Sequence, residues 1–140
     1  MGVRFFEEST LYRFRGKRKI RKWIENTVKL EGGVPGDINI ILCSDEFLCG
    51  LNFKYLKHNT LTDTITFPFE DGAGFLTGDI YISLPRVRDN AKKFNQTLSK
   101  ELHRVMIHGV LHLTGHKDKT LKDKAEMTGR EDYYLSLLED

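Results

Sequence analysis

Residues 105–118 of the 140-residue chain read Val105-Met106-Ile107-His108-Gly109-Val110-Leu111-His112-Leu113-Thr114-Gly115-His116-Lys117-Asp118. Up to residue 113 the side chains are apolar nearly all round a helical wheel, which is typical of a helix buried on every side. Such a helix must be enclosed by other elements, so we expect it at the centre of the core. Gly115 can adopt a positive φ, and we expect it to end the helix and reverse the chain.

Strands and helices are mixed along the rest of the chain. Strands are predicted at residues 3–6, 37–42, 62–67 and 78–83. Pro68 is expected to end the third strand, which would lie near a sheet edge. Helices are predicted at residues 17–30, 45–55, 85–94, 98–114 and 121–138, with caps at Ser44 or Asp45 and at Thr97 and with Pro85 in the first helical position. This order predicts an α/β (α+β) fold, a small mixed sheet of about four strands packed with about five helices.

Length and composition predict one folded domain over residues 1–140. The chain is 39% hydrophobic and 30% charged, an ordinary mixture for a globular protein, and it contains no repeat or linker-like stretch. No apolar run reaches the roughly 18 residues of a membrane span, and the N-terminus lacks a signal core. A cytoplasmic protein without a membrane partner is therefore expected. Cys43 and Cys49 fit no zinc spacing, and we expect two reduced thiols.

The two histidines of the buried helix are candidate metal ligands. His108 and His112 are four residues apart, so they lie on one helix face with their Cβ atoms about 6 Å apart. Two imidazoles at this spacing can reach one ion at about 2.0–2.1 Å. Asp118, ten residues after His108, is the favoured third ligand, and His116 is its rival. The free ring nitrogens would then need a carbonyl or a carboxylate.

Other readings of the histidine pair are a core helix whose histidines bond to neighbours, and a purely structural ion. A structural site would usually have four protein ligands, so an open site that also holds water is favoured. Zinc (Zn²⁺) is the expected ion, although other first-row divalent metals suit the same ligands. A zinc peptidase places a glutamate directly after its first histidine, and Gly109 at that position argues against peptide hydrolysis.

The segment from His108 to Gly115 resembles the metal-site signature of the YbeY family of ribosomal RNA maturation endoribonucleases. Three further stretches also resemble that family: Leu51-Asn52 with Tyr55, Thr62 to Pro68, and Gly78-Asp79-Ile80 with Ile82-Ser83. The resemblance covers roughly residues 37–135. It implies a small mixed α/β fold, a zinc-like ion, cleavage of single-stranded RNA, and a role in small-subunit ribosomal RNA maturation and ribosome quality control.

Two positions depart from the family pattern. Asp118 stands where the family usually has a third histidine, and Leu56 stands where it usually has an arginine. Lys57 and His58 follow Leu56, but a lysine lacks the planar fork that grips a phosphate with two hydrogen bonds. The resemblance implies RNA, and with it the ribosome or small-subunit proteins, as partners. The glycines at 72, 74 and 78 do not lead from a strand into a helix, so no nucleotide cofactor is expected.

The expected reaction is metal-assisted hydrolysis of a phosphodiester bond. His116 is the predicted proton-transfer group, and Lys57 is predicted to stabilise developing charge. The alternative is that both are ordinary surface residues. Competing functions are a non-catalytic, metal-stabilised ribosome-assembly or RNA-binding factor and a metallohydrolase of another substrate.

Seven basic residues lie between positions 13 and 22, although the net charge of the chain is only +2. This cluster predicts contact with an RNA backbone. Its alternative reading is the solvated face of a helix whose other face holds Ile20, Trp23 and Ile24. The residues predicted to bind RNA are Arg13, Arg15, Lys17, Arg18 and Arg21.

Overall fold

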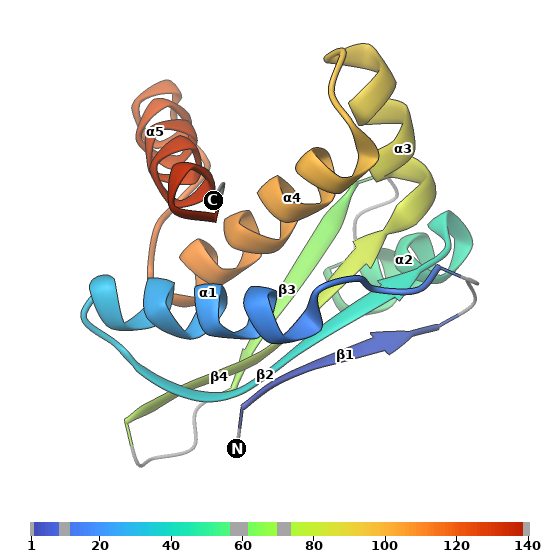
Figure 1. Ribbon diagram of the computed structural model, residues 1–140. Coiled ribbons are helices and arrows are strands. Elements are labelled where there is room, and N and C mark those ends of the chain that lie inside the picture. Colours follow the sequence, from blue (N-terminus) through green and yellow to red (C-terminus); the bar gives the residue numbers. More distant parts are fainter. Residues whose placement is uncertain (1, 9–11, 57–61, 70–73, 139–140) are drawn as a thin grey trace.

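The computed structural model describes residues 2–8, 12–56, 62–69 and 74–138 (Figure 1). Within these residues one four-stranded sheet has the strand order β1-β2-β4-β3. β1 and β2 are parallel, as are β2 and β4, whereas β3 runs antiparallel to β4. The predicted mixed sheet and the α/β class are therefore confirmed. The strands are β1 (Val3–Glu7), β2 (Val34–Cys43), β3 (Thr64–Phe69) and β4 (Phe75–Ser83).

Five α-helices accompany the sheet in the described residues: α1 (Lys17–Leu30), α2 (Asp45–Leu51), α3 (Leu84–Lys93), α4 (Leu98–Leu113) and α5 (Leu121–Leu138). The hydroxyls of Ser44 and Thr97 cap α2 and α4, as predicted, by accepting hydrogen bonds from first-turn amides. A π-helical turn, Asn52–Leu56, follows α2. None of these helices combines the length and the apolar character needed to cross a membrane.

Several predicted boundaries were wrong. β2 begins at Val34 and β4 at Phe75, earlier than the predicted starts at residues 37 and 78. β3 does not end before Pro68 but continues to Phe69. It is an edge strand, where a proline can lie without removing a hydrogen bond from a neighbour. The helix predicted over residues 45–55 is regular only to Leu51. Pro85 occupies the second helical position rather than the first, because Ser83 is the cap and Leu84 begins α3.

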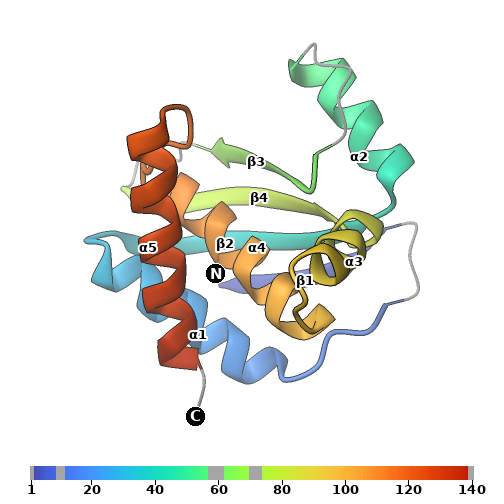
Figure 2. The same cartoon turned by 90° about the horizontal axis from the view of Figure 1, so that it is seen from above.

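The helices lie mainly on one face of the sheet (Figures 1 and 2). α1 and α4 pack on that face and α5 packs outside them, so α4 is enclosed as its sequence predicted. Alternate β2 residues Ile38, Ile40 and Leu42 point into this core. The other face carries a smaller cluster beneath α2, formed by Cys43, Leu48 and Ile65. Both cysteines are free thiols, as expected.

Gly109 brings α4 close to the sheet. A Cβ atom built at this position would lie 2.7 Å from Cγ2 of Ile80 on β4, a distance that real Cβ atoms do not show. A larger residue would therefore push α4 away from the strand. The close packing also places the C-terminal turns of α4 beside β3 and β4.

Candidate metal centre

The last two turns of α4 carry the histidine pair. His108 and His112 are both partly buried, and their Nε2 atoms are 3.0 Å apart. Their rings lie nearly edge to face, with centroids separated by 4.6 Å. The predicted convergence of two imidazoles on one side of the helix is thus present.

The chain reverses directly after α4. Thr114 is the C-cap and Gly115 has a φ of 107°. The Gly115 amide donates to the His112 carbonyl, and the His116 amide donates to the Leu111 carbonyl. These two bonds form a Schellman motif, which requires a residue of positive φ and is best served by glycine. The turn directs the following loop back along the helix.

This reversal brings Asp118 to the histidine pair. Asp118 Oδ2 lies 3.6 Å from His108 Nε2, and one ligand atom from each of the three residues lies within 4.8 Å of the others. In a tetrahedral zinc site with bonds of about 2.0–2.1 Å, neighbouring ligand atoms are about 3.3 Å apart. The spacing and the donor set of two imidazoles and one carboxylate therefore suit a small divalent ion, with a position left for water or substrate.

Glu131 on α5 fixes the orientation of the His108 ring. Its Oε2 lies 2.6 Å from His108 Nδ1, so that Nε2 faces Asp118. The other carboxylate oxygen accepts a hydrogen bond from Arg104. Burial tends to lower the pKa of His108, but the hydrogen bond and charge of Glu131 outweigh it and raise that pKa. Burial, together with the nearby His108, lowers the pKa of His112.

Sequence reasoning missed Glu131, although a signal was present. The buried face of α5 is formed by Met127, Glu131, Tyr134, Leu135 and Leu138. Glu131 is the one charged member of this otherwise mostly apolar stripe, and a buried carboxylate requires a partner. A metal-ligating histidine usually donates its second ring N–H to a carboxylate or carbonyl. The glutamate on this apolar stripe could therefore have been predicted as that acceptor.

The three residues line a cavity of about 600 Å³. Its opposite wall is β3 and the residues before it, which belong to the stretch from Thr62 to Pro68. Asp63 lies in this wall, and burial raises the pKa of its carboxyl group. Asp63 was not predicted as a site residue. Lys57, which was, lies outside the described residues.

The His116 side chain contacts Glu31 rather than the histidine pair. Its Nε2 lies 2.5 Å from Oε1 of Glu31, the C-cap residue of α1. Glu31 also accepts hydrogen bonds from the Tyr134 hydroxyl and from Arg130. Burial and the hydrogen bond to Glu31 raise the pKa of Tyr134 to about 12. His116 is not among the described residues that line the cavity with Asp118.

The residues predicted to bind RNA have different environments in the structure. Arg13, Arg15 and Lys17 line a second cavity, on a different side of α4. Arg18 is exposed on α1 outside that cavity. Arg21 is engaged within the fold, because its Nε donates to the Val3 carbonyl and its guanidinium lies 5.7 Å from the centre of the Phe5 ring.

Comparison with known proteins gives consistent matches along nearly the whole chain. Residues 6–139 match the family described as Endoribonuclease YbeY. A protein of that name from Cytophaga hutchinsonii is 47% identical over 133 residues, which cover 95% of this chain and 93% of the relative. One from Amoebophilus asiaticus is 41% identical, covering 95% and 90%. The solution structure of TM1509 from Thermotoga maritima aligns with a TM-score of 0.65 at 31% identity, covering 97% of this chain and 88% of that one.

Proposed function

The chain belongs to the YbeY family of endoribonucleases, and from this premise we propose that it cleaves RNA in the cavity that contains His108, His112 and Asp118. The enzyme is an RNA-cleaving hydrolase. The observation that carries the assignment of the reaction to this cavity is the convergence of three ligand atoms within 4.8 Å on its wall. Glu131 supports this assignment, because its contact with His108 Nδ1 orients the ring so that Nε2 faces the other ligand atoms.

Zinc is the ion we propose for the site, held by the two imidazoles and the Asp118 carboxylate. Nitrogen ligands with one carboxylate are common for catalytic zinc, although other first-row divalent ions accept them. When bound, such an ion activates a water molecule and offsets negative charge on a phosphate oxygen. The three residues would hold it at the end of α4, where Gly115 positions the third of them.

Asp63 is the proton-transfer group that the geometry supports. Its carboxyl lies in the lining of the same cavity as the histidines, and burial raises its pKa, so that it takes up a proton more readily than an exposed aspartate does. Asn90 donates to its Oδ2 and orients the carboxyl. The role predicted for His116 has less support, because Glu31 engages its ring nitrogen. Lys57 remains a prediction for charge stabilisation.

Single-stranded RNA, in particular ribosomal RNA during small-subunit maturation, is the proposed substrate, and the cytoplasm is the proposed location. A single strand can bend its backbone into a cavity between a helix and an edge strand, whereas a duplex holds its phosphates on a stiff outer surface. Contact with the ribosome or its small-subunit proteins follows from this proposal. The whole of residues 1–140 is proposed to act as one catalytic domain.

The experiment is single-turnover cleavage of a labelled RNA, presented as a single strand and as a duplex. The protein is stripped of metal with a chelator and then supplied with zinc or manganese. We expect the single strand to be cut only after metal is added. His112→Ala should abolish cutting, whereas Asp89→Asn, an exposed carboxylate on α3, should leave it unchanged. Cutting by the stripped protein, or by His112→Ala with metal, would contradict the proposal.

A further inference from the structure

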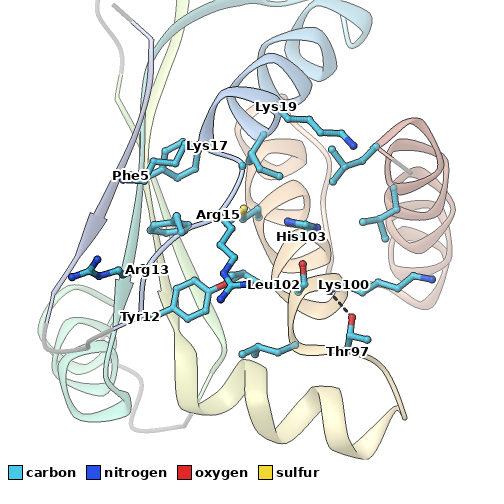
Figure 3. A pocket seen from close by; sticks show the side chains of 18 of the residues that line it. Phe5, Tyr12, Arg13, Arg15, Lys17, Lys19, Thr97, Lys100, Leu102 and His103 are labelled. Atoms are coloured by element: carbon cyan, nitrogen blue, oxygen red, sulfur yellow. Dashed lines mark hydrogen bonds between the residues drawn. The ribbon is translucent and has the colours of Figure 1, made fainter. Parts of the chain in front are cut away.

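A second cavity of about 1130 Å³ lies on the side of α4 away from the metal centre. It forms where residues 12–17 and the first turn of α1 meet the N-terminal half of α4 (Figure 3). His103 lines it, five residues before His108. At 1.5 Å and 100° per residue, the two side chains leave α4 about 7.5 Å apart along its axis and about 140° apart around it. The two cavities are therefore separated by the helix.

The second cavity is strongly basic. Among the described residues that line it there is no aspartate or glutamate. Gly16, in the left-handed conformation, is the N-cap of α1, so no side chain caps this helix, and its first turn contains no acidic residue. The positive end of the helix dipole adds to the side-chain charges. The basic residues of the lining are Arg13, Arg15, Lys17, Lys19, Arg88 and Lys100.

Aromatic rings alternate with these cations. Tyr12 and Phe14 pack edge to face at 5.8 Å, and Phe14 lies 4.8 Å from Phe5. In Figure 3 the Arg15 side chain extends toward Tyr12, whereas Arg13 points away from the other labelled residues. The partly buried His103 ring packs against Trp23, and no described residue forms a hydrogen bond with its nitrogens.

We propose that this cavity binds a part of single-stranded RNA that lies outside the cleavage site, with a base against Tyr12 and two backbone phosphates at Arg15 and Lys19. Cations beside accessible π-faces are the combination by which proteins hold unpaired nucleotides. An acidic peptide would use the cations but would leave the rings without a partner. The inference rests on the proposed function, because the occupant is a distal part of the substrate that the metal centre cuts.

A consequence is that RNA length should affect binding. A fragment of about four nucleotides can occupy the metal cavity alone, whereas one of about sixteen nucleotides can reach both cavities. The short fragment should gain nothing from the basic cavity, and the long one should bind more tightly. Disrupting the basic cavity should then raise KM for the long RNA without changing the cleavage of the short one.

The test is a fluorescence-anisotropy titration of metal-stripped protein with the two RNAs at several salt concentrations. For the long RNA we expect Arg15→Gln/Lys19→Gln to weaken binding about tenfold and to lower the salt slope by about 1.4, which corresponds to two lost phosphate contacts. Tyr12→Leu should also weaken binding, while Tyr12→Phe, which keeps the ring, should not. The matched control is Lys92→Gln/Lys93→Gln, which removes two exposed charges from the last turn of α3.

Two results would overturn the inference: a loss of affinity no larger than that of the control pair, or displacement of the RNA by a poly-glutamate peptide as effectively as by unlabelled RNA. The proposed function is judged separately, by zinc-dependent cutting of the short fragment. If the wild type cuts RNA while the Arg15 and Lys19 changes leave KM unaltered, only the second cavity is refuted. If binding needs Arg15 and Lys19 but nothing is cut, only the catalytic proposal is refuted.

Discussion

His108 and Asp118 illustrate how two ligands of one site can be held by different means. His108 is held at Nδ1 by Glu131, and its Nε2 faces Asp118 at 3.6 Å. Asp118 lies on a loop, and its position depends on the turn at Gly115. The histidine is therefore set by packing between α4 and α5, and the aspartate by the backbone after α4.

Glu131→Gln is predicted to weaken zinc binding about 10- to 100-fold, the usual effect of removing a carboxylate behind a ligating histidine. Glutamine still fills the space, but it no longer offers a charged acceptor to His108 Nδ1. Zinc affinity would be measured by competition with a chromophoric chelator. Glu126→Gln, an exposed change on the same helix, serves as the control. Equal affinities in the two variants would refute the role of Glu131.

Asp118→Ala is predicted to lose most of the zinc affinity, while Asp118→His is predicted to keep a third ligand and retain it. The same competition measurement compares them. His116→Asn provides the contrast, because His116 bonds to Glu31 and lies outside the cavity lining. If His116→Asn lost zinc and Asp118→Ala did not, the assignment of the third ligand would be reversed.

For individual site residues, the sequence predicted the positions of those that lie close together along the chain. The spacing of His108 and His112 predicted that their rings would converge, and Asp118 was favoured over His116 as the third residue, since one helix and one turn determine these positions. Glu131 and Asp63 belong to other elements, and only the packing of α5 and β3 against α4 brings them near. No local pattern fixes such distances, so these residues were missed.

Among the elements, α4 is the one on which both cavities depend. Its contact with β4 is close because Gly109 has no side chain to meet Ile80. Helix boundaries were predicted well where caps or glycines mark them, as for α1 and α4. The end of the strand at Pro68 and the end of the helix after Leu51 were predicted poorly, because the sheet edge and a π-helical turn override local preferences there.

Gly109→Ala is predicted to destabilise the protein by about 1–3 kcal/mol, the usual cost of overpacking, because the new methyl group would collide with Ile80. Gly129→Ala is the matched control. It lies within α5 with no atom near its Cβ position, and it should stabilise the protein by about 0.5–1 kcal/mol. Urea unfolding of the metal-free protein measures both. A Gly109→Ala variant as stable as the wild type would contradict the close packing.

For the whole molecule, Glu31 is the point where α1, the loop after α4 and α5 meet. It ends α1 and bonds to His116, Tyr134 and Arg130. Trp23 makes a second link by donating its indole N–H to the Tyr134 carbonyl. The loop that carries Asp118 is therefore tied through Glu31 to α1, which is remote in sequence, and to α5, which follows the loop.

The pKa of Glu31 predicts a pH dependence of stability. Burial alone would raise this pKa, but hydrogen bonds from Tyr134 and His116 and the charge of Arg130 lower it below its ordinary value of 4.5. A lowered folded-state pKa gives stability that is present above the unfolded value and is lost as the pH falls through the folded value. The difference in unfolding free energy between wild type and Glu31→Gln should therefore be constant above about pH 5.5 and shrink below 4.5. A difference that grows on acidification would contradict this.

The most direct test of the metal centre is an anomalous difference map at the zinc edge, from crystals grown with zinc. We predict one strong peak about 2.0–2.1 Å from Nε2 of His108 and of His112, with Asp118 as the third protein ligand. A peak at the Glu31 and His116 cluster, or none between the two imidazoles at full zinc saturation, would contradict the account.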